Sequence, residues 1–299
     1  MEFKSWYRQS ACGEGEIYSC GYFIENPKAI LQIAHGMCEH SGRYDEFARA
    51  LAEAGYLVCA NDHLGHGNSD LGHRGSFALS SGGFDYVIQD MDSLFEEVGS
   101  RYAGVPKMLL GHSMGSILAA LFADKYDYLE KLILMGSPAS NGLVGIAEKI
   151  LQHNVKKYGY THCSKLCNFL MWGPESFTLE EKRISKSWMS HDKENIERFI
   201  TDEKCNFAFN DSANLELVRG LQAWMQPTWG NQIPNIPILV IAGSEDKIGN
   251  NGKGPTSYYN RLKVKHDDVT LKLIEHNRHE ILNEATKHET FQYIIKWLD

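Results

Sequence analysis

The sequence predicts an α/β fold in which a mostly parallel sheet of about eight strands carries helices on both faces. Short apolar, β-branched segments alternate with segments of helical periodicity along most of the chain, and parallel strands joined in this way need crossover connections. The strand segments are apolar almost throughout, as expected for a sheet covered on both faces. With 299 residues, 43% of them apolar, the chain can bury a sizeable core.

Strands are expected where short apolar segments are bounded by turn residues. The first two segments form a hairpin around Gly13-Glu14-Gly15, and the later ones are far enough apart for helical crossovers. The expected strands are Phe3–Arg8, Ile17–Ile24, Ala29–Ala34, Tyr56–Ala60, Lys107–Leu110, Lys131–Met135, Ile238–Ala242 and Val269–Ile274.

Helices are expected where apolar residues recur at helical spacing between these strands. The first of them ends at Gly55, a residue that favours helix C-termini, and the last carries aromatic residues along its length. The expected helices are Tyr44–Ala54, Phe84–Val98, Met114–Lys125 and Glu280–Leu298.

One stretch, residues 137–232, breaks this alternation. It shows helical patterns without a clear strand and contains four of the six tryptophans. A helical, aromatic-rich insertion between two core strands predicts a lid, and the alternative is a second helical layer with an ordinary core. The expected organisation is therefore a core built from residues 1–136 and 233–299, interrupted by a lid at 137–232.

The charge balance argues against some classes of function. The chain has 30 Lys and Arg residues against 38 Asp and Glu, a formal net charge of −8, so broad nucleic-acid binding is not expected. The first 20 residues lack the apolar segment of a signal peptide, and the strongest apolar run, 236–242, is too short to span a membrane. We therefore expect a cytoplasmic protein whose seven scattered cysteines form no disulfide framework.

The strongest chemical signal is Gly111-His112-Ser113-Met114-Gly115, which follows an expected strand and precedes an expected helix. This is the context of a G-x-S-x-G nucleophile elbow. The tight turn requires small residues two positions before and after the serine, and it presents the hydroxyl beyond the carboxyl ends of the strands. Ser113 is therefore the candidate nucleophile, and the alternative is a glycine-rich turn without a function.

A serine hydroxyl needs a base, and the base needs an acid that fixes its tautomer. In this arrangement the acid and then the base follow the serine along the chain. Asp246 is the candidate acid because it comes just after an apolar strand, and Glu245 is its rival. His279 is the candidate base because it follows the last expected strand, and His276 is its rival.

An oxyanion hole needs backbone N–H groups that point at the carbonyl oxygen of the substrate. The expected strand Ala29–Ala34 runs directly into His35-Gly36, a turn that would hold the N–H of Met37 toward the pocket. The N–H of Met114, next to the nucleophile, would be the second donor.

No cofactor and no metal is implied by the motifs. His279-Glu280 begins like the zinc motif HExxH, but Asn283 stands where the second histidine is required. The dinucleotide fingerprint GxGxxG and the phosphate-binding loop are absent from the sequence.

Four segments together resemble the α/β-hydrolase superfamily, and within it the serine hydrolases of the lysophospholipase and monoacylglycerol lipase-like group. They are HGMCEHSGRY (35–44), DHLGHGNS (62–69), GHSMG (111–115) and the pair GSEDK (243–247) and NRHEILNE (277–284). The resemblance implies a catalytic set of Ser113, Asp246 and His279, with Met37 and Met114 as oxyanion donors.

The resemblance also implies that Glu39 and Arg43 help to bind the polar head of the substrate or to order the pocket, and the alternative is a structural ion pair. Met37 and Cys38 stand where this group more often has small residues, which narrows the alcohol side of the pocket. Asp62, His63, His66 and Gly67 are expected only to brace their loop.

The function implied is hydrolysis of a carboxylic ester of a single-chain lipid, either a lysophospholipid or a monoacylglycerol, through an acyl-enzyme. A small-ester carboxylesterase and a proline-aminopeptidase-like peptidase are the alternatives, because the fold does not choose the substrate. A peptidase needs an anchor for a free amino group, for which Glu175, Glu180 and Glu181 are the candidates. A non-catalytic binding protein on the same fold is a further alternative. The lid would allow transient contact with a membrane surface.

Overall fold

The computed structural model describes the chain except for residues 70–73, 79–82, 140–143 and 173–186. Its centre is one eight-stranded sheet in the order β1-β2-β4-β3-β5-β6-β7-β8. β2 pairs antiparallel with β1 and β4, and the other neighbours are parallel, which confirms the predicted α/β class and the mostly parallel sheet. The strands are β1 (Glu2–Gln9), β2 (Glu16–Phe23), β3 (Ile30–Ala34), β4 (Leu57–Asn61), β5 (Lys107–His112), β6 (Leu129–Met135), β7 (Ile238–Gly243) and β8 (Val269–Ile274).

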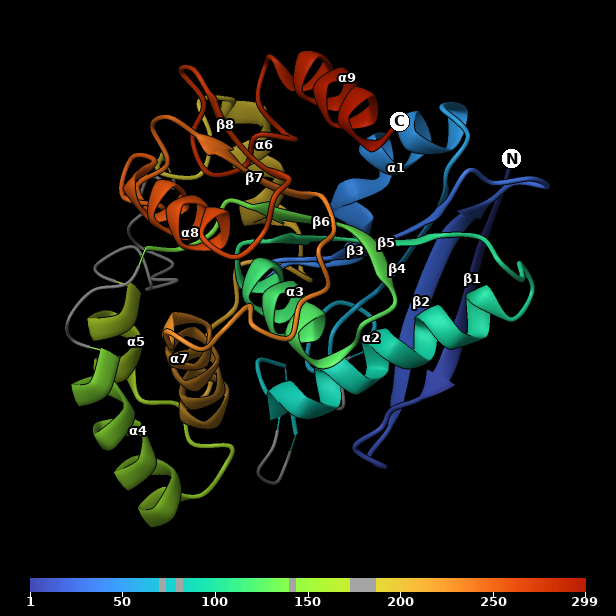
Figure 1. The fold of residues 1–299 in the computed structure, drawn as a ribbon. Coiled ribbons are helices and arrows are strands. Elements are labelled where there is room, and N and C mark those ends of the chain that lie inside the picture. Colours follow the sequence, from blue (N-terminus) through green and yellow to red (C-terminus); the bar gives the residue numbers. More distant parts are fainter. Residues whose placement is uncertain (70–73, 79–82, 140–143, 173–186) are drawn as a thin grey trace.

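Helices cover both faces of this sheet, as predicted (Figure 1). α1 and α9 pack on one face through residues such as Phe47 and Phe291, while α2, α3 and α8 pack on the other through Phe95, Ile117 and Leu262. The helices are α1 (Asp45–Glu53), α2 (Gly83–Gly99), α3 (Met114–Lys125), α4 (Val144–Tyr158), α5 (Lys165–Trp172), α6 (Lys193–Thr201), α7 (Asp211–Met225), α8 (Lys253–Lys263) and α9 (Lys287–Leu298), with a 3-10 turn η1 at Ser41–Tyr44.

The expected boundaries of the strands and of the first three helices lie within two residues of the observed ones. The start of the closing helix is wrong, because α9 begins at Lys287 and residues 280–286 form turns. In these turns Glu280 and Glu284 bind groups from distant parts of the chain, and a polar contact of that kind overrides local helix propensity. The pattern also did not predict α8.

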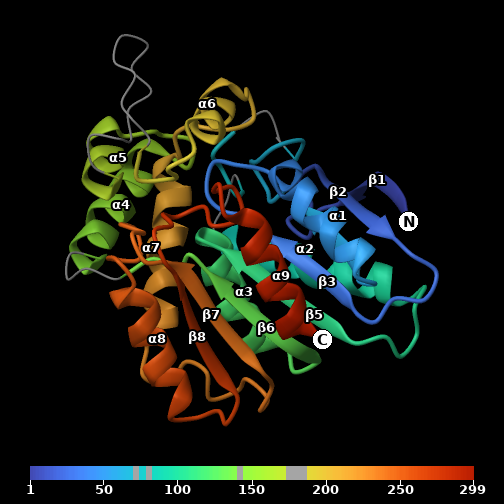
Figure 2. The ribbon, with the colours of Figure 1, turned by 90° about the horizontal axis from the view of Figure 1, so that it is seen from above.

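Between β6 and β7 the described chain forms α4 to α7 and contains no strand. Figure 2 shows α4, α5 and α6 on the same side of the molecule, and all three belong to the stretch 137–232 for which a lid is expected. Two of the tryptophans in this stretch belong to the core: Trp224 stacks on Tyr258 with ring centroids 4.2 Å apart, and Trp229 donates to the carbonyl of Ala120 at 2.9 Å.

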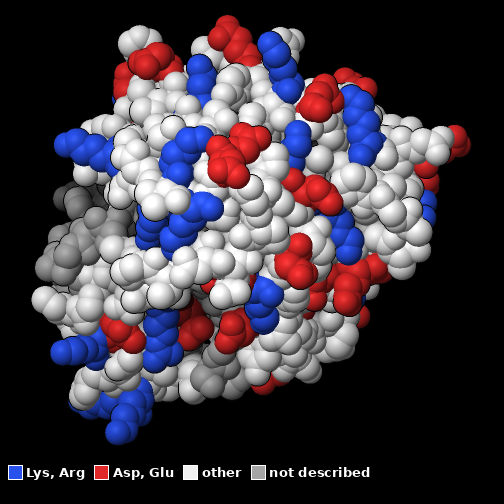
Figure 3. All heavy atoms as spheres, in the orientation of Figure 1, with Lys and Arg blue, Asp and Glu red and all other residues white. Residues whose placement is uncertain are grey.

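Two broad features of the molecule bear on its partners. Acidic and basic side chains are interspersed over the face seen in Figure 3, so this face offers no extended surface of one charge. Within the described residues, none of the helices combines the length and the apolar character that crossing a bilayer demands.

Candidate active site

Ser113 occupies a strained turn between β5 and α3. Its backbone has φ 53° and ψ −116°, a conformation that is costly for a residue with a side chain. The surroundings hold it there, because its N–H donates to the Met135 carbonyl at 2.9 Å. A Cβ on Gly111 would lie 2.1 Å from the Gly115 carbonyl oxygen, and one on Gly115 would lie 2.0 Å from that of Ala34. Both glycines are therefore required sterically, as a nucleophile elbow demands.

Asp246 and His279 form a buried pair. Nδ1 of His279 lies 3.0 Å from Oδ2 of Asp246, and the two residues are 4% and 0% exposed respectively. The backbone N–H of Ile248 donates to the other carboxylate oxygen of Asp246 at 2.9 Å. Burial alone would lower the pKa of His279, but the charge and hydrogen bond of Asp246 outweigh it and raise the pKa. The imidazolium that a general base becomes is therefore stabilised.

The two rival residues contact each other at the surface instead. Glu245 accepts from His191 at 2.8 Å and lies 3.4 Å from Nδ1 of His276, whose side chain is 88% exposed. The burial that gives a catalytic acid its effect on a base is absent there.

The loop that carries His279 packs directly against the elbow. The ring of His112, next to Ser113, lies 4.8 Å from the ring of His279, and its Nε2 is 3.3 Å from the His279 carbonyl oxygen. Trp188, from the insertion, also contacts His279, with its ring 5.5 Å from the imidazole. The loop that carries the candidate base thus lies against the turn that carries the candidate nucleophile.

The two expected oxyanion donors lie at the ends of neighbouring elements. Met114 opens α3, so its N–H has no acceptor within the helix. Met37 lies in a turn with Cys38, directly after Gly36, whose N–H donates to Glu39 Oε1 at 2.6 Å. Among the described residues no acceptor is found for the Met37 N–H, so both groups can serve a ligand.

Three buried histidines, His35, His63 and His66, pack beside this turn. His35 donates from Nδ1 to the Gly36 carbonyl at 2.8 Å and accepts at Nε2 from the His63 N–H at 2.9 Å, and its ring lies 5.2 Å from that of His66. Burial lowers the pKa of all three rings, that of His66 to about 3. Within the loop that these residues are expected to brace, Nδ1 of His66 lies 2.9 Å from the Leu64 carbonyl oxygen.

Glu39 and Arg43 are held by protein groups. Arg43 Nη1 donates to Glu39 Oε2 at 2.8 Å, and the guanidinium also makes two bonds to the carboxylate of Glu280, at 2.6 and 2.7 Å. These contacts match the structural alternative more closely than direct substrate binding. Sequence reasoning missed Glu280, Glu284 and Asn195, although the first two stand at the i and i+4 positions of the segment NRHEILNE.

His40, Asp202 and Cys205 are the one group of potential metal ligands that lies close enough together within the described part of the chain. His40 Nε2 is 2.9 Å from Asp202, and its Nδ1 accepts from the Gly42 N–H at 3.2 Å. Nε2 therefore carries the ring proton and donates a hydrogen bond to Asp202. This hydrogen bond accounts for the close approach of His40 and Asp202.

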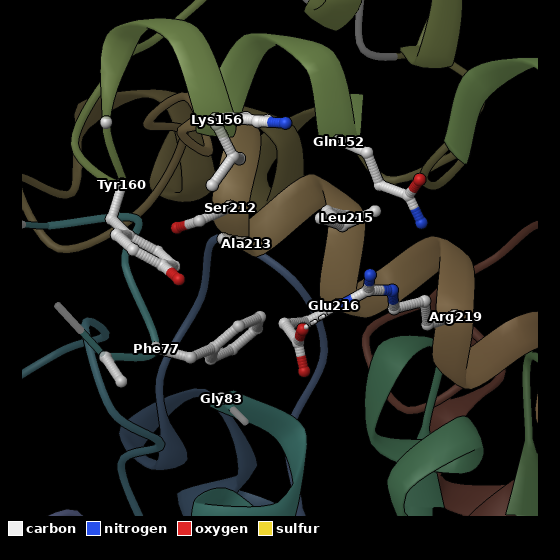
Figure 4. Close-up of a pocket in the computed structure, with 13 residues that line it drawn as sticks. Phe77, Gly83, Gln152, Lys156, Tyr160, Ser212, Ala213, Leu215, Glu216 and Arg219 are labelled. Atoms are coloured by element: carbon white, nitrogen blue, oxygen red, sulfur yellow. Dashed lines mark hydrogen bonds and ion pairs between the residues drawn. The ribbon is translucent and has the colours of Figure 1, made fainter. Parts of the chain in front are cut away.

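A separate cavity of about 540 Å³ lies between α4, α7 and the start of α2 (Figure 4). Phe77 forms its floor, Lys156 and Tyr160 approach from the α4 side, and Glu216 and Arg219 pair with each other on α7 at 3.3 Å. None of the candidate catalytic residues lines it. The peptidase anchors Glu175, Glu180 and Glu181 lie outside the described residues.

Comparison with known proteins indicates a serine hydrolase family, as the geometry of the Ser113 turn does. The family model described as "Hydrolase_4: Serine aminopeptidase, S33" matches residues 25–286. The monoglyceride lipase of Rattus norvegicus is 31% identical over 284 residues, which cover 91% of this chain and 84% of that protein. A thermostable carboxyl esterase from Bacillus coagulans superposes with a TM-score of 0.91 at 28% identity, covering 100% of this chain and 98% of that one. A structure titled "Lipase (Open form)" superposes with a TM-score of 0.87 at 26% identity, covering 100% and 98%.

Proposed function

The chain belongs to the serine aminopeptidase S33 family of α/β-hydrolases, and from this premise we propose that it hydrolyses carboxylic esters of single-chain lipids. Its similarity to monoglyceride lipases and to a carboxyl esterase makes it an α/β-hydrolase of the lipase and esterase type. The finer proposal is that the substrate is a monoacylglycerol or a lysophospholipid and that Ser113, His279 and Asp246 carry the reaction.

The observation that carries this proposal is the buried Asp246–His279 pair, whose histidine lies on the loop that packs against the strained Ser113 turn. In the proposed reaction, Ser113 Oγ attacks the ester carbonyl carbon while Nε2 of His279 takes its proton. Asp246 accepts a hydrogen bond from the Nδ1–H group of His279 and stabilises the imidazolium that forms. The oxyanion accepts hydrogen bonds from the N–H groups of Met37 and Met114.

Collapse of the tetrahedral intermediate breaks the bond to the leaving alcohol, which receives its proton from His279. Water, deprotonated in turn by His279, then attacks the acyl carbon. The bond between that carbon and Ser113 Oγ breaks, the fatty acid is released, and His279 returns the proton to Ser113 Oγ. The buried surroundings strengthen each of these charge interactions relative to bulk water.

A second candidate is a carboxylesterase for small esters. The observation that favours it is the superposition on the Bacillus coagulans carboxyl esterase over the full chain. Both candidates use the same chemistry, so only the length of the acyl chain separates them.

The test is a hydrolysis panel on the purified protein, with p-nitrophenyl esters from C2 to C16, a monoacylglycerol, a lysophosphatidylcholine and a proline-terminated peptide. Lipid-ester turnover that rises with chain length and is lost in Ser113→Ala is expected. Turnover confined to the shortest esters would assign the small-ester function. Cleavage of the peptide alone, or equal activity in Ser113→Ala, would contradict the proposal.

A further inference from the structure

We propose that Arg43 is a positioning residue, which clamps the loop that carries Met37 to the loop that carries His279. This proposal rests on the proposed function, since both loops belong to the same site. It gives Arg43 a role in assembling the oxyanion hole and the base, in place of contact with the substrate.

The clamp is a buried, bidentate ion pair. Arg43 Nη1 and Nη2 donate to the two oxygens of Glu280 at 2.6 and 2.7 Å, and Nη1 also donates to Glu39 at 2.8 Å. The arginine side chain is 9% exposed and each carboxylate is 4% exposed. Charged hydrogen bonds with this fork geometry are directional as well as strong.

At one end the clamp fixes the oxyanion turn. The oxygen of Glu39 that does not face Arg43 accepts from the N–H of Gly36 at 2.6 Å and from the hydroxyl of Tyr44 at 2.7 Å. Gly36 directly precedes Met37. The carboxylate that Arg43 binds therefore sets the direction of the peptide that presents the Met37 N–H.

At the other end the clamp fixes the base loop. Glu280 is the residue after His279, and its own N–H donates to the Met189 carbonyl at 2.9 Å. Its carboxylate also accepts from Asn195 Nδ2 on α6 at 2.7 Å, and Arg43 closes the ring by donating to Asn195 Oδ1 at 2.9 Å. The guanidinium lies 4.9 Å over the ring of Phe199 on the same helix.

The reaction needs the two loops in fixed relative positions, because the oxyanion donor and the base act at the same moment on one reacting ester group. A shift of about 1 Å in either group costs about 100-fold in rate in well-studied cases. The guanidinium is engaged by three protein side chains, Glu39, Glu280 and Asn195, so its geometry suits support of the site better than capture of a ligand.

Charge provides an independent readout of the clamp. The groups that face His279 are Asp246 from the β7 loop, His112 from β5, and the cluster of Glu39, Glu280 and Arg43. Removing the negative charge of Glu280 disfavours the imidazolium, so the acid limb of the kcat/KM profile should move to lower pH. A substitution of Arg43 that keeps its positive charge should leave that limb in place.

The experiment compares Arg43→Lys and Glu280→Gln with the wild type, using p-nitrophenyl butyrate and thermal unfolding. In Arg43→Lys we expect kcat to fall about 10- to 100-fold and KM to stay within about twofold, because the charge remains but the fork is lost. The matched control is Arg49→Lys, since Arg49 pairs with Asp45 at 2.8 Å on the exposed face of α1. It should keep the wild-type kcat.

A raised KM at unchanged kcat in Arg43→Lys would overturn the proposal in favour of substrate binding. Wild-type kcat in Arg43→Lys, with an unmoved acid limb in Glu280→Gln, would also overturn it. Arg43→Met leaves two buried carboxylates without their cation and is expected to unfold, so the two milder variants carry the test. Full activity in Ser113→Ala would instead show that the proposed function itself has failed.

Discussion

The helical insertion has two halves that are built differently. The outer half, α4 and α5, packs on α7 through a small apolar cluster and leaves Ile146 and Leu166 60% and 63% exposed. The inner half, residues 187–210, is tied to the core by buried polar contacts and by aromatic rings. The outer half therefore packs on another helix of the insertion, whereas the inner half is attached directly to the core.

The polar ties of the inner half converge on the base loop. Glu284 accepts from the Ser190 hydroxyl at 2.8 Å, from the His191 N–H at 2.9 Å and from the Arg278 N–H at 3.0 Å. Phe207 and Phe209 place their rings 5.2 and 5.3 Å from that of His66, whose ring lies 5.2 Å from that of His35. The difference between the halves teaches that one inserted segment can both line a cavity and hold the loop that carries His279.

The sharpest way to break this comparison is Glu284→Ala. It leaves one buried and two partly buried donors without an acceptor, so we expect a loss of about 3 to 5 kcal/mol in the free energy of unfolding. Glu284→Gln keeps one acceptor oxygen and should cost less. Urea unfolding measures both. A loss below about 1 kcal/mol in the alanine variant would show that the inner half is not anchored here.

A pair of truncations compares the halves directly. Met189 in the inner half is 1% exposed and packs against Phe199 and Cys205, so Met189→Ala should cost about 2 to 4 kcal/mol. Leu166→Ala in the outer half should change the free energy of unfolding by less than about 0.5 kcal/mol. Equal losses in the two variants, measured by chemical denaturation, would remove the distinction.

The third effect is a pH dependence of the free energy of unfolding. It comes from His66, which the inner half contacts through Phe207 and Phe209. Burial lowers the pKa of His66 to about 3, whereas the unfolded chain binds a proton near pH 6.5. Stability from this ring is therefore complete above pH 6.5 and falls as the pH drops toward 3, by about 2 kcal/mol at pH 5.

The measurement for this third effect is the free energy of unfolding at pH 7.5 and pH 5, in the wild type and in His66→Gln. The variant should lose about 2 kcal/mol less between the two pH values. An equal loss in both proteins would show that His66 does not contribute to the acid sensitivity.

Local pattern predicts one part of this site and not another. The Ser113 turn follows from two glycines that sterics require, and the strands follow from apolar segments, so both are visible in the sequence. The clamp joins Arg43 to Glu280, 237 positions away, and no local pattern indicates the partner of a polar side chain at that distance.

Burial makes a distinction that the sequence left open. Asp246 and Glu245 are neighbours in the chain, as His279 and His276 nearly are, and only the fold places one pair inside and the other at the surface. The same long-range contacts explain why the closing helix begins later than its periodicity predicts. The use of Ser113, Asp246 and His279 in catalysis stays a prediction.

The most direct test of the account is covalent labelling with a fluorophosphonate probe, followed by mass spectrometry of the digested protein. We expect one adduct on Ser113, formed quickly in the wild type, much more slowly in Asp246→Asn, and not at all in Ser113→Ala. An adduct on another residue, or a folded wild-type protein that the probe does not label, would contradict the central claim that this turn holds an activated nucleophile.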